Sequence, residues 1–247
     1  MILGLDTATE WVHLALAGSD HQSPVGEGGS WAKRALTGPG NSASSVLLPT
    51  VDELLIDAGA ARKDIKGVAA CIGPGGFTSL RVGVATAEGL AINGLCAWGF
   101  SAFELRARAL RLAQEKSGGG QKNVCIVLDG QRKEAFLQEW DTAAPEPLGP
   151  AEKVPLAELQ AVIGPRAWWT PERFCEQVQP AIGRPPIALG DEGKATLAAL
   201  VELCHVCSTR SPENPLVPFY LRETDAEINF PEASRHLKEE HRRGVAR

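Results

Sequence analysis

The sequence predicts an α/β protein built from two related lobes. Strand-like and helix-like patterns alternate along its 247 residues, and each half opens with an apolar strand that ends in an aspartate, Asp6 or Asp129. Gly118-Gly119-Gly120 lies between the halves and disfavours helix and strand alike. We therefore expect a first lobe over residues 1–118, a second lobe over 119–224 and a charged tail over 225–247.

Apolar runs and turn residues define the elements of the first half. Leu47, Val51 and Leu54 recur at helical spacing, which predicts a helix from Asn41 to Ala58 with a kink or a late start at Pro49. A helix over 79–93 follows, and another over 102–116 carries a basic face. Strands are predicted over residues 1–5, 11–17, 67–72 and 96–99, with a further one near Ser30-Trp31.

The second half begins with a predicted hairpin. Val124–Leu128 and Glu134–Trp140 are strand-like and flank Asp129-Gly130, a dipeptide that favours turns. Helices are predicted over 171–178 and 193–207. Two more strands are predicted, at 186–189 between these helices and at 217–221 near the end.

Charge and hydropathy exclude several classes of protein. The net charge is −5 and the pI about 5.6, whereas proteins that hold RNA unaided usually carry a basic stripe. No apolar run reaches the roughly 18 residues that a membrane span requires. The first residues lack the basic region and long apolar segment of a signal peptide. We expect a cytoplasmic protein that does not contact a membrane.

Two turn motifs are candidate phosphate-binding loops. Asp6-Thr7-Ala8-Thr9 joins two strands, and Gly73–Thr78 joins a strand to a helix with glycines at 73, 75 and 76. Thr78 or Ser79 could cap the helix, and a helix N-terminus behind a glycine loop can bind anions. The Gly-Lys-Ser/Thr ending of a P-loop is missing. From the residues alone, a structural turn is the favoured interpretation of Asp6–Thr9, whereas for Gly73–Thr78 a structural turn and an anion site are equally compatible with the sequence.

The helix over 79–93 has a face of small residues. Gly83, Ala87 and Ala91 recur every fourth residue, and Ala85 and Gly89 form a second such pair. A glycine inside a helix costs about 1 kcal/mol relative to alanine, so the pattern indicates a closely packed neighbour. That neighbour is either the chain's own sheet or another protein.

Catalytic and metal chemistry have little support in the sequence. The five histidines provide no pair at zinc-like spacing, and Cys204-His205-Val206-Cys207 has no second cysteine pair. No G-x-S-x-G nucleophile motif is present. We predict no catalytic residue, no metal site and no cofactor.

Several motifs together resemble those of the TsaB (YeaZ) family. They are Ile2-Leu3-Gly4-Leu5-Asp6-Thr7-Ala8-Thr9, Gly73–Gly83, Leu128–Glu134 and Pro218-Phe219-Tyr220-Leu221-Arg222. The resemblance covers residues 1–222, and the Gly-Pro-Gly-x-Phe-Thr-x-x-Arg core at 73–81 is its most specific part.

The resemblance implies an actin-like, sugar-kinase-like (ASKHA) fold in which each lobe has a mixed sheet and flanking helices. It also implies a role in making threonylcarbamoyladenosine beside the anticodon of tRNAs that read codons beginning with A. In that family a homologous partner, TsaD, is catalytic, and TsaB docks on it through first-lobe helices. The TsaE ATPase joins the complex. The resemblance implies that tRNA is bound only by this complex and that isolated TsaB could form a homodimer.

The residues fit a non-catalytic subunit of this kind. Ala43-Ser44-Ser45-Val46 lacks the histidine that family members often keep there, and Thr7-Ala8 replaces a glycine of ATP-using relatives. The predicted partner interface comprises Leu47, Val51, Leu54, Gly83, Ala87 and Ala91. Vestigial phosphate turns are predicted at Asp6, Thr7, Gly73, Gly75, Gly76 and Asp129. A nucleotide-dependent kinase or ATPase of the same fold is the alternative, and a metalloprotease is a weaker one.

Overall fold

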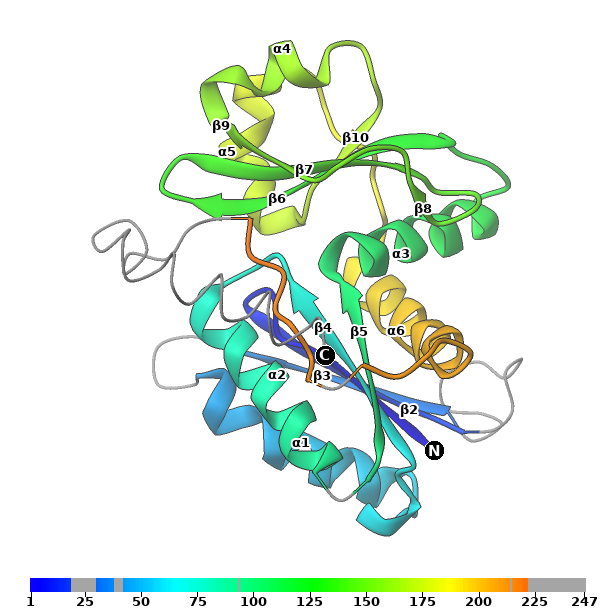
Figure 1. Ribbon diagram of the computed structural model, residues 1–247. Coiled ribbons are helices and arrows are strands. Elements are labelled where there is room, and N and C mark those ends of the chain that lie inside the picture. Colours follow the sequence, from blue (N-terminus) through cyan, green and yellow to red (C-terminus); the bar gives the residue numbers. More distant parts are fainter. Residues whose placement is uncertain (19–29, 38–41, 93, 214, 222–247) are drawn as a thin grey trace, which may run out of the picture.

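The computed structural model describes residues 1–18, 30–37, 42–92, 94–213 and 215–221, which form two lobes, each built on its own sheet (Figure 1). The predicted tail over 225–247 lies outside these residues. Among the described residues, no helix is long and apolar enough to cross a membrane.

Lobe one contains a five-stranded mixed sheet in the order β3-β2-β1-β4-β5. β1, β2 and β3 pair in antiparallel fashion, while β4 and β5 continue the sheet parallel to β1. The strands are β1 (Ile2–Asp6), β2 (Trp11–Ala17), β3 (Ser30–Leu36), β4 (Gly67–Gly73) and β5 (Cys96–Ser101). The mixed sheet predicted for this lobe is therefore confirmed.

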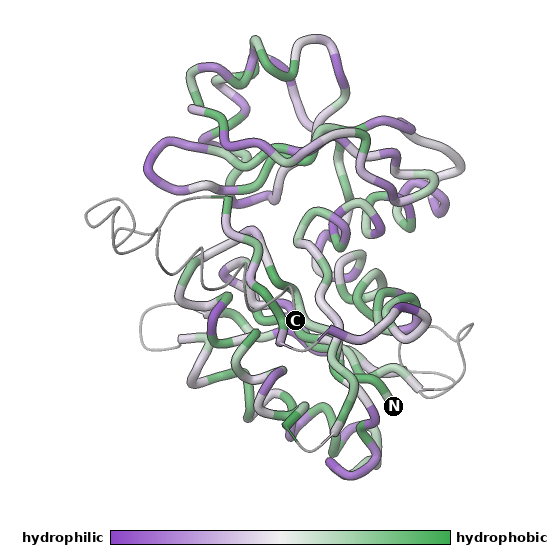
Figure 2. The backbone as a smooth tube through the Cα atoms, in the orientation of Figure 1, coloured by the Kyte–Doolittle hydropathy of each residue, from purple (hydrophilic) through white to green (hydrophobic). Residues whose placement is uncertain are grey.

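Helices cover both faces of the first sheet. α1 (Ala43–Asp57) and α2 (Phe77–Ala91) pack on the face of the sheet to which the side chains of Leu3 and Leu5 point. α3 (Ala102–Lys116) and α6 (Glu192–Ser208) pack on the opposite face (Figure 1). Successive strand residues point to opposite faces, so the two helix pairs have separate apolar cores. Hydrophobic and hydrophilic residues alternate along the helices, as Figure 2 shows.

Lobe two is smaller and has its own mixed sheet in the order β10-β6-β7-β8, with β9 also paired to β7. The hairpin predicted around Asp129-Gly130 is present as β6 (Asn123–Gln131) and β7 (Glu134–Asp141). The other elements of lobe two are β8 (Glu146–Pro147), β9 (Glu152–Pro155), a 3₁₀ turn (Leu156–Glu158), α4 (Leu159–Ile163), β10 (Trp168–Trp169) and α5 (Glu172–Ile182). Lobe one also contains a 3₁₀ turn, at Arg62–Asp64.

Two predicted strands are not formed. Residues 186–189 and 217–221 are irregular, and each contributes single bonds to a strand: Ile187 N–H to Trp168 O at 2.8 Å, and Phe219 N–H to Ile72 O at 2.7 Å. Prolines supply the physical reason, because Pro186 and Pro218 lack the N–H that a ladder requires. α1 continues through Pro49, so its expected late start does not occur.

The chain returns to lobe one before it ends, which changes the predicted division. α6 packs against β1 and β2, and a Cβ atom placed on Gly4 would lie 2.6 Å from Cys204 Sγ. Glycine at this position lets α6 approach the sheet closely. Lobe two is therefore inserted between α3 and α6, and the helix predicted within lobe 119–224 belongs structurally to lobe one.

An ion-pair network joins the two helices at this junction. Glu104 and Arg108 of α3 pair with each other at 3.1 Å, and Arg210 pairs with Glu104 at 2.5 Å. Glu202 of α6 accepts from Arg108 at 2.5 Å and also from Arg111. Because these groups are partly buried, the network fixes α3 against α6 more firmly than exposed pairs would.

Candidate functional site

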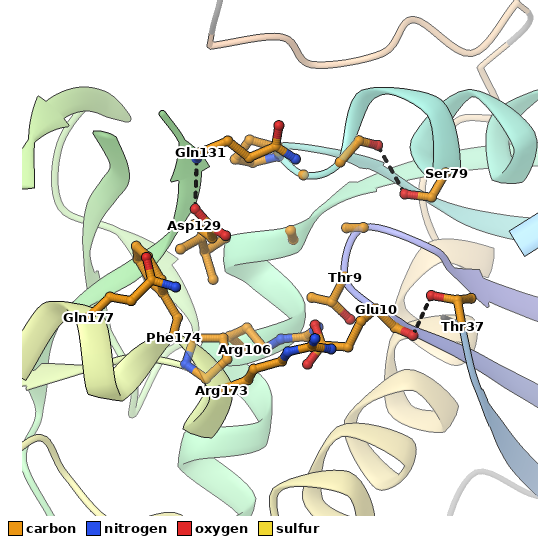
Figure 3. A pocket seen from close by; sticks show the side chains of 17 residues that line it. Thr9, Glu10, Thr37, Ser79, Arg106, Asp129, Gln131, Arg173, Phe174 and Gln177 are labelled. Carbon is orange, nitrogen blue, oxygen red and sulfur yellow. Dashed lines mark hydrogen bonds between the residues drawn. The ribbon is translucent and has the colours of Figure 1, made fainter. Parts of the chain in front are cut away.

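A cavity of about 490 Å³ lies between the lobes (Figure 3). It is bordered by the two turns singled out in the sequence, by α3, by the end of β6 and by α5. The lining residues are Ala8, Thr9, Glu10, Thr37, Pro74, Gly75, Gly76, Ser79, Ala102, Arg106, Leu128, Asp129, Gln131, Pro171, Arg173, Phe174 and Gln177.

Asp6 lies buried beneath this cavity in an ion pair. Its Oδ2 is 3.1 Å from Arg106 Nη2 and 3.3 Å from His13 Nδ1, while its Oδ1 accepts the Ala8 N–H at 3.0 Å. Burial by itself raises the pKa of the Asp6 carboxyl. Arg106, His13 and the Ala8 amide all lower this pKa, and their combined effect exceeds that of burial. The pKa of Asp6 therefore lies well below its usual range. Asp6 is therefore a carboxylate whose charge is already paired within the protein.

Glycines in the second turn allow it to pack directly on the first. A Cβ atom on Gly75 would lie 2.3 Å from Ala8 O, and the Gly76 N–H donates to that same oxygen at 3.0 Å. Gly73 has φ +112° and lies close to Phe219 O. These glycines therefore hold the two predicted phosphate turns together, and one of their amides is already satisfied.

The start of α2 differs from the predicted cap. Gly76 is the N-cap residue and no side chain caps the helix, so neither Thr78 nor Ser79 does so. Ser79 Oγ instead donates to Gly76 O at 3.1 Å. The first turn contains no acidic residue. The positive end of the α2 dipole is thus not neutralised by its own first turn.

Asp129 approaches the same cavity from lobe two. It is exposed, and its Oδ1 accepts the Gln131 N–H at 2.7 Å in the β6–β7 turn. The structure thus brings Gly75, Gly76 and Asp129 to one cavity, while Asp6 and Thr7 are buried behind it.

Sequence reasoning missed Arg106. It predicted a basic face on the helix over 102–116, yet Arg106 is only 1% exposed and Arg108 is buried as well. A usable signal existed, because residues 102–110 contain three charged side chains among six apolar ones. Arg106 lies two residues, or about 200° around an α-helix, from both Glu104 and Arg108, so the three charges cannot share one exposed face and Arg106 is the one expected to be buried and paired.

The predicted interface residues all lie inside lobe one. Leu47, Val51, Leu54, Gly83, Ala87 and Ala91 are buried in the core between the sheet and the helices α1 and α2. A Cβ atom on Gly83 would lie 2.3 Å from Thr7 Oγ1. The small-residue face therefore packs on the chain's own first turn and sheet, and a partner surface on these helices requires other residues.

The outward faces of the same helices carry a different set of residues. Ile92, which follows α2, is 82% exposed, and in α1 Ile56 is 76% and Leu48 50% exposed. Ala85 and Gly89 are exposed on α2, and a Cβ atom on Gly89 would meet nothing within 4 Å. α1 and α2 therefore present apolar and small residues on the side away from the sheet.

The strand order, the two mixed sheets and the cavity between paired turns define an actin-like protein of two α/β lobes. Its motifs and fold are both similar to the TsaB (YeaZ) family, as the sequence predicted. YeaZ from Pseudomonas aeruginosa superposes with a TM-score of 0.65 at 20% identity, over 89% of this chain and 99% of that chain. A second structure, described as similar to peptidase YeaZ from Pseudomonas aeruginosa, gives 0.66 at 21% identity, over 90% and 99%.

Sequence comparison finds similarity to a TsaB protein and to the TsaD family. The Haemophilus influenzae tRNA threonylcarbamoyladenosine biosynthesis protein TsaB is 29% identical over 147 residues, which is 56% of this chain and 52% of that protein. The match thus spans about half the length of that relative. A model of the TsaD family, described as tRNA N6-adenosine threonylcarbamoyltransferase, matches residues 41–146.

Proposed function

We propose that the chain is a non-catalytic scaffold subunit needed for threonylcarbamoylation of the adenosine 3′ to the anticodon in tRNAs that read codons starting with A. It acts in the cytoplasm by dimerising with a TsaD-like catalytic protein, and a TsaE-like ATPase joins the assembly. The similarity to TsaB supports the pathway, and the buried Asp6–Arg106 pair is the observation that carries the non-catalytic role.

An Mg²⁺-nucleotide does not fit the residues at the first turn. A metal held there would need the Asp6 carboxylate, but that group already pairs with Arg106 and lies beside His13. A divalent cation at Asp6 would approach the Arg106 guanidinium, and like charges repel strongly in a buried site. The paired state of Asp6 therefore argues against a kinase or ATPase of the same fold.

The outward face of α1 and α2 offers a surface for a partner helix. Ala85 and Gly89 leave room for a second helix to approach at the low end of the usual 8–10 Å axial distance. Leu48, Ile56 and Ile92 supply apolar area around them. We propose this face for the TsaD contact, or for a homodimer when the protein is isolated. Co-elution of the purified chain with TsaD from the same organism in equal amounts tests the proposal, and failure to associate contradicts it.

The isolated protein should not turn over ATP. The expectation rests on the ion pair that Asp6 forms with Arg106. Phosphate release at saturating ATP and Mg²⁺ measures the turnover. The Asp6→Asn variant controls for contaminating enzymes. Steady turnover that disappears in Asp6→Asn would favour the kinase or ATPase alternative instead.

Tight binding of tRNA should require the complex. The net charge of −5 leaves little excess of cations to contact phosphates. A gel-shift titration at physiological salt should show no sub-micromolar binding by the chain alone and clear binding once TsaD is added. A truncation that lacks residues 226–247 controls for the basic side chains of the tail. Sub-micromolar binding by that truncated chain alone would contradict the proposal.

A further inference from the structure

A cluster of Phe77, Arg81 and Tyr220 lies on the surface near the start of α2. Arg81 Nε donates to the Tyr220 hydroxyl at 3.1 Å, although the two residues are 139 positions apart in the chain. Arg81 Cζ lies 3.9 Å from the centre of the Phe77 ring, and the centres of the two aromatic rings are 5.3 Å apart. Phe77 is 39% and Tyr220 37% exposed. The three side chains therefore orient one another while they remain open to a partner.

The last described segment of the chain brings Tyr220 to this cluster. Residues 215–221, in orange in Figure 1, pass beside α2 in the direction opposite to the helix. Leu216 N–H donates to Glu88 Oε1 at 3.2 Å, near the end of the helix. Tyr220 reaches Arg81 near its start. The fold therefore fixes the hydroxyl group that orients Arg81.

The guanidinium of Arg81 has hydrogen-bond donors left at its outer end. Tyr220 uses its Nε and Phe77 covers one of its faces, which leaves the N–H groups of Nη1 and Nη2. Within the described ranges, no carboxylate pairs with Arg81. Glu88 is the one acidic residue of α2, and it lies about two turns further along the helix. Two parallel N–H groups match the two oxygens of a carboxylate or a phosphate.

The surroundings of Arg81 favour a carboxylate on a protein over a phosphate of RNA. Arg81 is the single basic residue of α2, whereas surfaces that bind RNA gather several cations. The exposed residues that follow it on the outward face are Ala85, Gly89 and Ile92, which are small or apolar. Arg81 also covers one face of the Phe77 ring, on which a base could otherwise stack.

We propose that Arg81, oriented by Phe77 and Tyr220, binds an aspartate or glutamate side chain of the TsaD-like partner. This inference rests on the proposed function and adds a charged contact about 6 Å, or one helical turn, from Ala85 on the outward face of α2. Arginine and tyrosine are frequent among the residues that dominate binding energy. A side chain that is held in place before binding also loses less conformational freedom on association.

Titration of the chain with TsaD from the same organism, followed by calorimetry, tests the contact. Arg81→Gln should weaken association at least about tenfold, because the carboxylate of the partner then loses both of its donors. Arg81→Lys keeps the charge but not the paired N–H groups, so its affinity should lie between those of Arg81→Gln and the parent. Tyr220→Phe keeps the ring but removes the acceptor of Arg81 Nε, and should weaken association about threefold or more.

Lys194→Gln is the matched control for the loss of one positive charge. Lys194 is exposed on α6, which packs on the opposite face of the sheet from α2. The affinity of this variant for TsaD should stay within a factor of about two of the parent, because distant exposed charges are screened. Arg81→Gln should melt at the parent temperature, since Arg81 is exposed and glutamine favours a helix nearly as well as arginine.

Neutralising the surface aspartates and glutamates of TsaD one at a time locates the other half of the contact. One such substitution should weaken binding to the parent chain at least about tenfold and have almost no further effect on binding to Arg81→Gln. This non-additivity identifies the carboxylate that Arg81 contacts.

Parental affinity of Arg81→Gln for TsaD, or the absence of a TsaD carboxylate coupled to Arg81, would overturn the proposal. An Arg81→Gln variant that binds TsaD normally, but whose complex with TsaD loses affinity for tRNA, would also overturn it and assign the site to an RNA phosphate. If the parent chain itself does not bind TsaD, the scaffold function fails and this contact fails with it. The parent titration therefore separates the two failures.

Discussion

Replacing Arg106 by methionine should lower the free energy of unfolding by about 3–5 kcal/mol, the cost of breaking a buried ion pair by removing one partner. Both side chains are at most 1% exposed, so water cannot replace the lost guanidinium at Asp6. Urea unfolding of parent and variant measures the difference. Arg62→Met is the control, since its exposed pair with Asp52 should contribute at most about 1 kcal/mol.

The same variant should change how stability depends on pH. The folded pKa of Asp6 lies below its unfolded value near 4, so the pair stabilises the parent above about pH 4 and its contribution is lost as the pH falls further. In Arg106→Met, burial without the cation raises the pKa of Asp6, and protonation then favours the folded state. If Arg106→Met unfolds like the parent at neutral pH, the pair is not a determinant of stability.

Substitutions on the two faces of α2 should have opposite effects on folding and assembly. Gly83→Leu should prevent folding, because a Cβ atom there already lies 2.3 Å from Thr7 Oγ1. Gly89 faces open space, so Gly89→Leu should raise helix stability by up to about 1 kcal/mol. If a partner helix packs on that face, the leucine side chain will hold it away and weaken association at least about thirtyfold.

Thermal melting of the isolated variants and size-exclusion with TsaD separate the two effects. A Thr86→Leu variant, on α2 but only partly exposed, serves as a control for general changes in helix propensity. If Gly89→Leu melts at or above the parent temperature and still co-elutes with TsaD at parental affinity, the outward face of α2 is not the interface.

Local patterns predicted most of the secondary structure because each element carries its own signal. The helix over 102–116 and the hairpin around Asp129-Gly130 were predicted closely, since apolar spacing and turn residues define them. The cavity turns were also found, because glycines cluster where two backbones meet. Residues 217–221 were misassigned as a strand: Phe219 N–H bonds to Ile72 O of β4, but Pro218 has no N–H and limits strand pairing.

Contacts between distant segments could not be predicted in the same way. The periodicity that identified Gly83, Ala87 and Ala91 shows that one face of α2 packs closely, but it does not say against what. The pairing of Asp6 with Arg106 joins residues 100 positions apart, and nothing local to either residue indicates the other. The site therefore depends on topology, while its turns depend on sequence.

The return of α6 to lobe one has a consequence for the order in which the protein folds on the ribosome. The sheet of lobe one is complete once β5 has emerged, and α3 can then cover part of its second face. The part of that face around Gly4 stays uncovered until Leu200 and Cys204 of α6 have been synthesised. The inserted lobe has its own core, which includes Val127 and Trp168, and its elements are contiguous in the chain. Lobe two can therefore reach its native packing first, while the nascent N-terminal sheet waits for the last helix.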